Sequence, residues 1–359
     1  MVMTTTEGAI GECDGVENTP KKKASPPTPF ALLSRTTESF LASHSPEAGP
    51  AALLSSLPKK WSSYPPMILF HQSAFSSPEW KSYLSTLPED LLALFYAQIA
   101  TSLKATHLAL NAPIQSTAIR SPQITPLHGD FGTYTADQPT QQDFDSAFWA
   151  TSMQNGIKQT WAPLYTMFSR GNITEKARVL QFPQVEGEEE EVADLFVGIG
   201  YFAFSYLKGG AKRVWGWDLN PWSVEGLRRG GTMNGWRCAV DPSEVNDEQI
   251  VVYNEDNEKA VEVLGGYGVK VRHVNLGLLP DSECAWRVAT EILDPEGGYI
   301  HVHANCRDNE IGDWCQSTVT EFLKLFGNHW EVRIFDKFRV KGFGPGVGHW
   351  VLDLYCKKS

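Results

Sequence analysis

Two glycines and an acidic residue have the spacing of a nucleotide-binding turn. Gly198 and Gly200, in the stretch Gly198-x-Gly200-x-x-Ala203, match a tight turn that lets a ligand approach the backbone. Asp218 follows roughly 20 residues later, where a carboxylate can accept hydrogen bonds from ribose hydroxyls. This pattern fits a nicotinamide dinucleotide and S-adenosylmethionine equally well. A glycine turn that only packs a helix against a sheet is the alternative without a ligand.

Two further features favour the methionine-bearing nucleoside. Asp194 precedes the turn, where its charge would repel a pyrophosphate but can accept hydrogen bonds from an ammonium group or from loop amides. Asp256 and Asn257 follow a later predicted strand, and Asp256 can accept a hydrogen bond from the adenine amino group. Helix capping is the alternative role for this pair.

Alternating strand and helix patterns, starting near residue 164, place these residues at strand ends. We predict an α/β protein: a class I methyltransferase-like Rossmann fold with a mostly parallel sheet and an antiparallel edge strand, preceded by a smaller α+β domain. The predicted strands cover 192–196, 213–217, 250–257, 269–279, 297–306, 330–340 and 348–356. The predicted helices cover 201–208, a segment starting at Asn220-Pro221, 286–293 and 314–326.

Three regions are expected along the chain. Residues 1–29 are polar and rich in Thr, Gly and Pro, which predicts a disordered tail. Residues 30–161 have an irregular pattern that indicates a small α+β N-terminal domain. Residues 162–359 are expected to form the catalytic domain that binds S-adenosylmethionine.

Composition limits the class of protein. The six cysteines include no Cys-x-x-Cys pair, which argues against a zinc ribbon or a disulfide scaffold. No apolar run reaches the roughly 18 residues of a membrane span, so we expect a cytoplasmic protein. The formal net charge of −11 argues against indiscriminate nucleic-acid binding but allows a local basic face. The sequence does not predict an oligomeric state.

Six motifs in a fixed order resemble one known family. They are YTMFSRGNITEKARV, DLFVGIGYF, DLNPWS, NEDN, VNLGLLPDSECAW and IHVHAN. Together they resemble the tRNA wybutosine-synthesising protein 2 family of aminocarboxypropyl transferases, which is related to the methyltransferases acting on N1 of guanosine 37. The resemblance covers roughly residues 125–356 and extends weakly upstream.

The resemblance implies a reaction, a donor and an RNA partner. The 3-amino-3-carboxypropyl group of S-adenosylmethionine would move to a carbon of 4-demethylwyosine at position 37, in the anticodon loop of tRNA-Phe, with release of methylthioadenosine. The donor-binding positions of the family fall on Ser169, Lys176, Asp218, Asp256 and Asn257. Asp218 is a Glu in some relatives, and the shorter side chain keeps the same acceptor chemistry.

Transfer of the amino-acid arm requires an anchor for the carboxylate of that arm. We expect Lys176, supported by Ser169 and Arg170, to hold it so that the γ-carbon faces the incoming base. Ordinary surface cations are the alternative for Lys176 and Arg170. Asn275, in NLGLLP, is expected to hydrogen-bond the polar edge of a flipped-out base, with a turn-stabilising role as the alternative. No general base is evident.

Other candidate residues are given non-catalytic roles. His301 and His303 share one face of a predicted strand, but no third ligand matches them, so packing or RNA contact is expected and no metal is predicted. Trp215, Trp217 and Trp222 are expected in the core or pocket wall. A cationic stretch is expected either to meet anticodon-stem phosphates or to be a solvated strand edge; it comprises Arg333, Lys337, Arg339 and Lys341.

Three other functions stay open at this point. The nearest is a guanosine-37 N1-methyltransferase that uses the same donor and RNA. A non-catalytic tRNA-binding subunit that keeps the fold is the second. A nicotinamide-dependent dehydrogenase is the third and the most distant.

Overall fold

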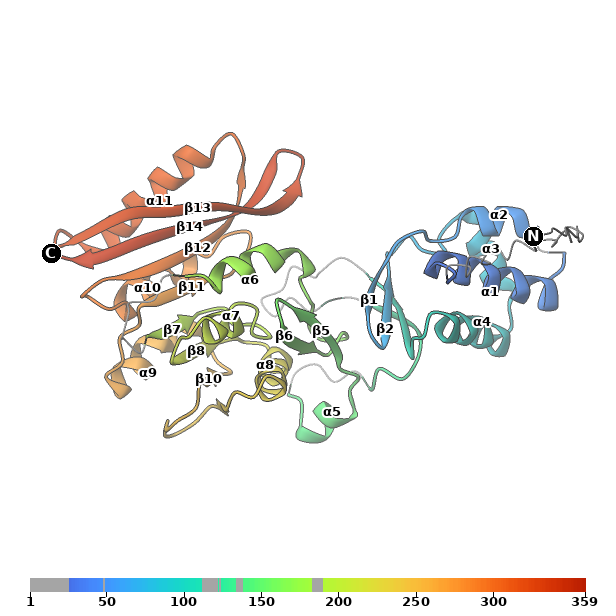
Figure 1. Ribbon diagram of the computed structural model, residues 1–359, viewed down its shortest axis with the longest axis horizontal. Helices are drawn as coiled ribbons and strands as arrows, with labels where there is room; N and C mark the ends of the chain where they lie inside the picture. The colour runs from blue at the N-terminus through green and yellow to red at the C-terminus, as the bar shows by residue number, and fades with distance from the viewer. Residues whose placement is uncertain (1–25, 48, 112–121, 123, 134–137, 183–189) are drawn as a thin grey trace, which may run out of the picture.

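The computed structural model describes residues 26–47, 49–111, 122, 124–133, 138–182 and 190–359 (Figure 1). Of the tail predicted to be disordered, only residues 26–29 are described. Helix α1 (Pro29–His44) begins there, with Thr28 as its N-cap, accepting a hydrogen bond from the Ala31 N–H, and with Pro29 at the first helical position. This helix was not predicted, although its Thr-Pro start is a typical helix signal.

The N-terminal part is a four-stranded sheet with helices at its far end in Figure 1. Its strands pair in the order β1 (Trp61–Tyr64), β2 (Met67–Phe70), β3 (His107–Leu110) and β4 (Thr125–His128). The other helices at this end are α2 (Pro50–Ser55), α3 (Pro78–Thr86) and α4 (Glu89–Ser102), whereas α5 (Gln141–Ser146) lies apart from them, nearer the middle of the molecule in Figure 1. Residues 77–103 have helical spacing, but they divide into α3 and α4 because Pro88 follows the extended Leu87.

The C-terminal part contains an eight-stranded sheet, ordered β13-β14-β12-β11-β7-β8-β10-β9. The six strands from β12 to β9 are parallel, and β14 pairs antiparallel with both β12 and β13. This arrangement confirms the predicted fold class. The strands are β7 (Glu191–Asp194), β8 (Arg213–Trp217), β9 (Cys238–Val240), β10 (Ile250–Tyr253), β11 (His273–Leu276), β12 (Gly298–Arg307), β13 (Trp330–Gly344) and β14 (Val347–Lys358).

Helices and short 3-10 turns connect these strands. They are η1 (Arg170–Asn172), α6 (Ile173–Val179), α7 (Ala203–Lys208), α8 (Pro221–Met233), η2 (Asn257–Lys259), α9 (Ala260–Tyr267), η3 (Glu283–Ala285), α10 (Trp286–Ile292) and α11 (Ile311–Phe326). Helix α7 begins two residues later than predicted, because the glycine turn continues to Phe202. Strand β9 was not predicted.

A hairpin of β5 (Ala150–Gln154) and β6 (Ile157–Trp161) lies between the two parts. Strand β6 packs on α8 of the C-terminal part, since the Cβ of an alanine at Gly226 would lie only 2.9 Å from the Thr160 carbonyl oxygen. The domain boundary after residue 161 stays a prediction.

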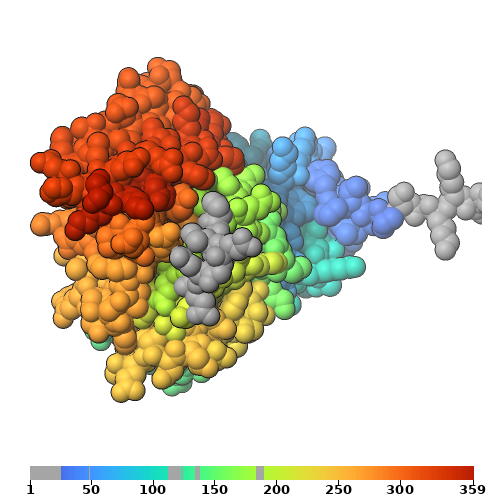
Figure 2. Space-filling model, turned by 60° about the vertical axis from the view of Figure 1, so that its left-hand side comes forward, coloured from blue at the N-terminus to red at the C-terminus, as the bar shows by residue number. Residues whose placement is uncertain are grey.

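The C-terminal hairpin, β13–β14, extends beyond the rest of the sheet (Figure 1). The part of β13 next to the hairpin turn reaches η1 and α6, where the Thr174 hydroxyl donates a hydrogen bond to the Val340 carbonyl oxygen at 3.4 Å. In Figure 2 the red C-terminal segment borders the green one. Two segments about 170 residues apart therefore meet beside the glycine turn.

Candidate active site

The glycine turn between β7 and α7 requires glycine at two positions. Gly198 has a φ of +55° and Gly200 a φ of +84°, a left-handed backbone that side chains disfavour. A Cβ at Gly200 would also lie 2.6 Å from the Phe204 ring, and one at Gly198 would lie 3.0 Å from the Tyr201 ring. The turn is therefore fixed by backbone conformation and packing together.

Asp218, just after β8, hydrogen-bonds to the glycine turn. One carboxylate oxygen accepts from the Gly198 N–H at 3.0 Å, and the other accepts from the Asn220 N–H at 2.8 Å. Burial raises the pKa of the Asp218 carboxyl to about 6, against the effect of these two donors. The sequence-predicted pair of glycine turn and acid is thus brought together.

Asp194 and Asn275 lie side by side at the carboxyl ends of β7 and β11, paired in register. Their exposed fractions are 0% and 1%. Within the described residues, Asp194 Oδ2 and the two polar atoms of the Asn275 amide make no hydrogen bond of regular geometry, although the amide lies close enough to Asp194 to oppose the effect of burial on its pKa. Burial raises the pKa of Asp194 to about 7. Unpaired buried polar atoms are costly, and in an open α/β sheet the carboxyl ends of the strands face the ligand.

Lys176 is a buried cation on α6. Its ammonium donates to Gln154 Oε1 at 3.0 Å and to Gln159 Oε1 at 2.6 Å, and it lies 4.7 Å from the centroid of the Phe168 ring. Burial, with a smaller effect from Lys341, lowers the pKa of Lys176 to about 7. The alternative of an ordinary surface cation is wrong for this residue, which is 2% exposed.

Ser169 and Arg170 precede α6 but face different neighbours. The Ser169 hydroxyl accepts a hydrogen bond from the Lys341 ammonium at 3.2 Å. The Arg170 side chain is exposed, and its guanidinium lies 5.5 Å from the centroid of the Tyr64 ring on β1. Ser169 is thus held at the start of η1 by the Lys341 side chain. The Arg170 side chain lies against Tyr64 of the N-terminal sheet. Its support of Lys176 therefore stays a prediction.

Asp256 and Asn257 follow β10. Asp256 caps η2 by accepting a hydrogen bond from the Glu258 N–H at 3.0 Å, so the capping alternative describes its position in this structure. The Asn257 amide donates to the Leu195 carbonyl oxygen at 2.8 Å, which ties this loop to the end of β7. Both residues lie at the same sheet edge as Asp194, and their contact with adenine stays a prediction.

The two histidines of β12 belong to a buried polar network. His301 contacts Asp353 Oδ1 at 2.7 Å and His273 Nδ1 at 3.0 Å, and Arg178 pairs with Asp353. His303 contacts His349 at 2.9 Å. These rings are 1% exposed, so direct RNA contact is wrong and packing is confirmed. Within the described part of the chain, no group of three or more His, Cys, Asp or Glu side chains is arranged to hold a metal.

Three tryptophans expected in the core are buried there. Trp215 and Trp217 are 0% exposed and Trp222 is 1% exposed. Trp222 stacks on Tyr165 with ring centroids 3.6 Å apart. They support the sheet and α8 and do not stack on bases.

The cationic stretch of β13 does not act as one basic face. Arg339 forms a bidentate pair with Asp308 at 2.9 Å, and Arg333 lies over the Tyr355 ring. Lys341 turns inward to Ser169 and Asn172. Sequence reasoning missed Lys341 as a site residue, together with Gln154 and Gln159. Alternation along β5, β6 and β13 was the available signal, but it does not identify a partner.

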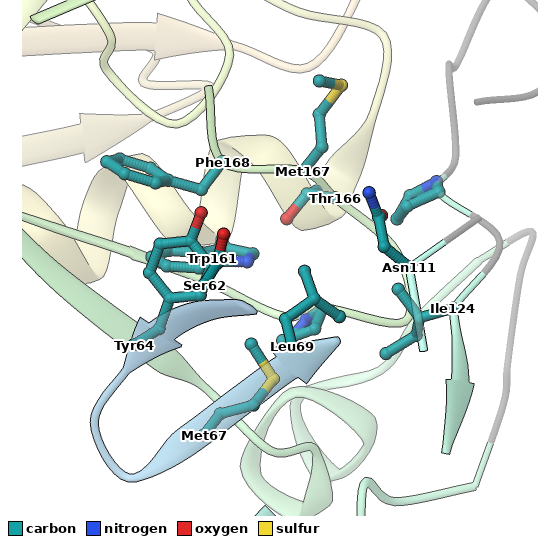
Figure 3. A pocket seen from close by; sticks show the side chains of 12 residues that line it. Ser62, Tyr64, Met67, Leu69, Asn111, Ile124, Trp161, Thr166, Met167 and Phe168 are labelled. Carbon is teal, nitrogen blue, oxygen red and sulfur yellow. The ribbon is translucent and has the colours of Figure 1, made fainter. Parts of the chain in front are cut away.

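A cavity of about 330 Å³ lies beside this site, at the junction with the N-terminal sheet (Figure 3). Figure 3 shows Tyr64, Trp161 and Phe168 grouped on one side, facing Asn111 and Ile124. Trp161 and Phe168 stack with centroids 4.6 Å apart, and Tyr64 stands nearly perpendicular to Trp161. None of the described lining residues is charged: Ser62, Tyr64, Met67, Leu69, Asn111, Pro122, Ile124, Trp161, Pro163, Thr166, Met167 and Phe168.

Comparison with known proteins places this geometry in a family. Residues 151–311 match the model of the TRM5/TYW2 methyltransferase domain. The tRNA wybutosine-synthesizing protein 2 of Schizosaccharomyces pombe is 41% identical over 83% of this chain and 72% of its own. The protein of the same name from Saccharomyces cerevisiae is 33% identical over 90% of this chain and 80% of its own.

Two solved structures share the fold. The P. horikoshii TYW2 in complex with MeSAdo has a TM-score of 0.64 at 20% identity, covering 91% of this chain and all of that one. The aTrm5 complex with tRNALeu has a TM-score of 0.59 at 15% identity, covering 95% of this chain and 82% of that one. At these identities the likeness concerns the fold.

The fold and the site together define an S-adenosylmethionine-dependent transferase with a class I methyltransferase-like domain. Its open polar atoms and glycine turn fit that donor. More particularly, the chain belongs to the tRNA wybutosine-synthesizing protein 2 family. The family and the tRNA-modifying transferase class expected from the six motifs are thereby confirmed. Among the described residues, no helix has the length and apolar character needed to cross a bilayer.

Proposed function

We propose that the protein transfers the 3-amino-3-carboxypropyl group of S-adenosylmethionine to a carbon of 4-demethylwyosine, at position 37 in the anticodon loop of tRNA-Phe. The observation behind this proposal is the environment of Lys176. Its hydrogen-bond partners among the described residues are the neutral amides of Gln154 and Gln159. A buried ammonium with neutral partners is prepared for an incoming anion. The carboxylate of the donor's amino-acid arm is such an anion.

The remaining donor contacts follow from the same sheet edge. Asp194 Oδ2, which makes no hydrogen bond of regular geometry in the described part of the chain, would accept from the donor's ammonium group. Asp218 would accept from the ribose hydroxyls, while Asp256 and Asn257 would contact adenine. Bound S-adenosylmethionine supplies a sulfonium-activated γ-carbon and a neutral thioether leaving group, methylthioadenosine. The residues that hold the arm decide which carbon of the sulfonium is presented, because displacement needs in-line approach at about 3 to 3.5 Å.

We assign Asn275 to the acceptor base. Its amide nitrogen and oxygen lie at the end of β11, next to Asp194, and within the described residues neither makes a hydrogen bond of regular geometry. Such an amide can bind the polar edge of a flipped-out base. A bond forms between the ring carbon and the γ-carbon as the carbon–sulfur bond breaks. The proton of the ring carbon then leaves to water, which restores the aromatic ring.

The aromatic cavity is assigned to a base that flanks the modified one. Phe168 lines the cavity and also contacts Lys176, so the cavity and the donor site share a wall. Uncharged aromatic walls favour stacking with a nucleobase, worth roughly 1 to 3 kcal/mol per base. Replacing Ile124 with Trp should fill the cavity, raising the KM for tRNA while leaving the dissociation constant for the donor unchanged. We place this activity in the cytoplasm.

The test is a reaction with two separately labelled donors. The enzyme is incubated with tRNA-Phe carrying the tricyclic precursor and with S-adenosylmethionine labelled in the methyl or the carboxyl carbon. Carboxyl label in RNA and methyl label in released methylthioadenosine are expected. Methyl label in the RNA would establish the guanosine-37 methyltransferase alternative instead. No transfer of either label, without measurable donor binding, would support a non-catalytic subunit.

A further inference from the structure

Lys341 is separated by about 170 residues of sequence from the turn formed by Ser169 and η1, but it contacts that turn directly. Its ammonium donates to Ser169 Oγ at 3.2 Å and to Asn172 Oδ1 at 2.9 Å. Ser169 is the N-cap of η1 and Asn172 is its last residue, and this turn leads into α6, which carries Lys176. The C-terminal hairpin thus reaches over the turn and closes it with a charged group.

The turn is shaped to receive the lysine side chain. Gly171 lies between the two acceptors, and a Cβ there would come within 2.7 Å of Lys341 Cδ and 3.0 Å of Lys341 Nζ. Gly171 does not have a positive φ, so its backbone does not call for glycine. The lack of a side chain at this position serves the close approach of the lysine chain.

The other cations of β13 do not share this placement. Arg339, two residues earlier, pairs with Asp308 on the outer side. Lys337 is exposed. Burial lowers the pKa of Lys341, and Lys341 in turn contributes to the lowered pKa of Lys176. The two lysines are therefore close enough to interact, and they approach the same turn from different elements.

We infer that Lys341 is a positioning residue for the donor: it fixes the turn of Ser169 and Asn172 so that Lys176 meets the carboxylate of the amino-acid arm. The inference rests on the proposed function for the identity of that arm. It replaces the expectation that Lys341 binds anticodon-stem phosphates. Misplacement of a reacting group by about 1 Å costs roughly 10²-fold in rate. At metal sites, loss of a side chain that orients a ligating residue typically costs about 10- to 100-fold in affinity or activity, and we expect an effect of that order here.

Three single variants and one double variant of the full-length protein test this inference. Lys341→Met removes the ammonium, while Gly171→Ala keeps the lysine but displaces it from both acceptors. Lys337→Met is the matched control on the same strand. Calorimetry should show donor affinity reduced about tenfold or more in the first two variants and unchanged in the control. The double variant should be no weaker than Lys341→Met alone, because both changes break the same contact.

The tRNA side of the kinetics separates positioning from phosphate binding. With Lys341→Met, the KM for tRNA and its dependence on salt should match the wild type. A raised KM for tRNA, a salt slope lower by about one and unchanged donor affinity would overturn the inference in favour of a phosphate contact. Far-UV circular dichroism and thermal midpoints confirm that each variant is folded. Donor affinity is measured without turnover, so this result is independent of which group the enzyme transfers.

Discussion

The ammonium of Lys176 donates a hydrogen bond of 2.6 Å to Gln159, which links the cation to the glycine turn. The other end of the Gln159 amide donates to the Gly200 carbonyl oxygen at 3.0 Å. One neutral amide therefore fixes both the cation proposed to hold the donor's arm and the turn proposed to hold its nucleoside. The distance between these two parts of the site is set by β6, which contributes Gln159.

Donor binding should depend on pH through Lys176. Its pKa is about 7, so the free enzyme loses the ammonium charge as the pH rises above 7. Affinity for a carboxylate falls with that charge, by at most tenfold per pH unit. Calorimetry with S-adenosylmethionine between pH 7 and 9 should show this loss. Lys176→Arg should show a smaller loss over the same range, set by the donor's own α-amino group, since a guanidinium stays protonated.

The acidic side of the same profile should depend on Asp194. Burial raises the pKa of its carboxyl to about 7, so it loses negative charge as the pH falls below 7. The donor's ammonium then loses its acceptor, and affinity should fall toward pH 5.5. Asp194→Asn should weaken binding at pH 7.5 and remove most of this acidic decline. The decline in donor affinity that remains at low pH in this variant should come from Asp218, whose pKa is about 6. An unchanged acidic limb in Asp194→Asn would contradict the assignment.

Asp218 should act through the ribose. Asp218→Asn removes a charged acceptor, and such hydrogen bonds are worth roughly 1.5 to 3 kcal/mol, or about 10- to 150-fold in donor affinity. A donor analogue lacking the ribose hydroxyls should bind wild type and variant with nearly equal affinity. If the variant weakens both ligands by the same factor, Asp218 serves the glycine turn and not the ribose.

Gly200→Ala should disrupt the turn. The new Cβ would lie 2.6 Å from the Phe204 ring at a φ of +84°, where a left-handed backbone alone costs about 1 to 2 kcal/mol. We expect a lower urea midpoint and loss of donor binding. The matched control is Gly265→Ala in α9, where a Cβ meets no atom within 4 Å. That change should stabilise the protein by about 0.5 to 1 kcal/mol and leave donor binding intact.

The buried ion pair between Arg178 of α6 and Asp353 of β14 should be important for stability. Arg178 bonds Asp353 and Glu175, and the Asp353 side chain is 0% exposed. Removing one partner of a buried pair typically costs 3 to 5 kcal/mol, because the other charge stays buried. Arg178→Met should therefore lower the unfolding free energy by about that amount in urea titrations. Arg339→Met, which breaks an exposed pair with Asp308, should leave the midpoint nearly unchanged.

The sequence predicted the parts of the site that are local. Gly198, Gly200 and Asp218 lie within one strand-turn-helix-strand unit, whose glycine spacing and alternating pattern can be recognised without a structure. Contacts between distant segments could not be predicted. Lys176 was expected to hold an anion, but its amide partners on β5 and β6 follow only from how the hairpin packs. The inward turn of Lys341 likewise depends on register shifts in β13, which no periodicity shows.

Strand β14 pairs with β12 on one side and β13 on the other, and it carries Asp353, the partner of Arg178. Strand β14 is the last strand of its sheet to be synthesised. Until it is made, a nascent chain lacks the strand that joins β13 to β12. A messenger with a stop codon before β14 would encode a product whose β12 edge is bare. Quality control by proteases, and not weaker catalysis, should then decide how much of that product the cell retains.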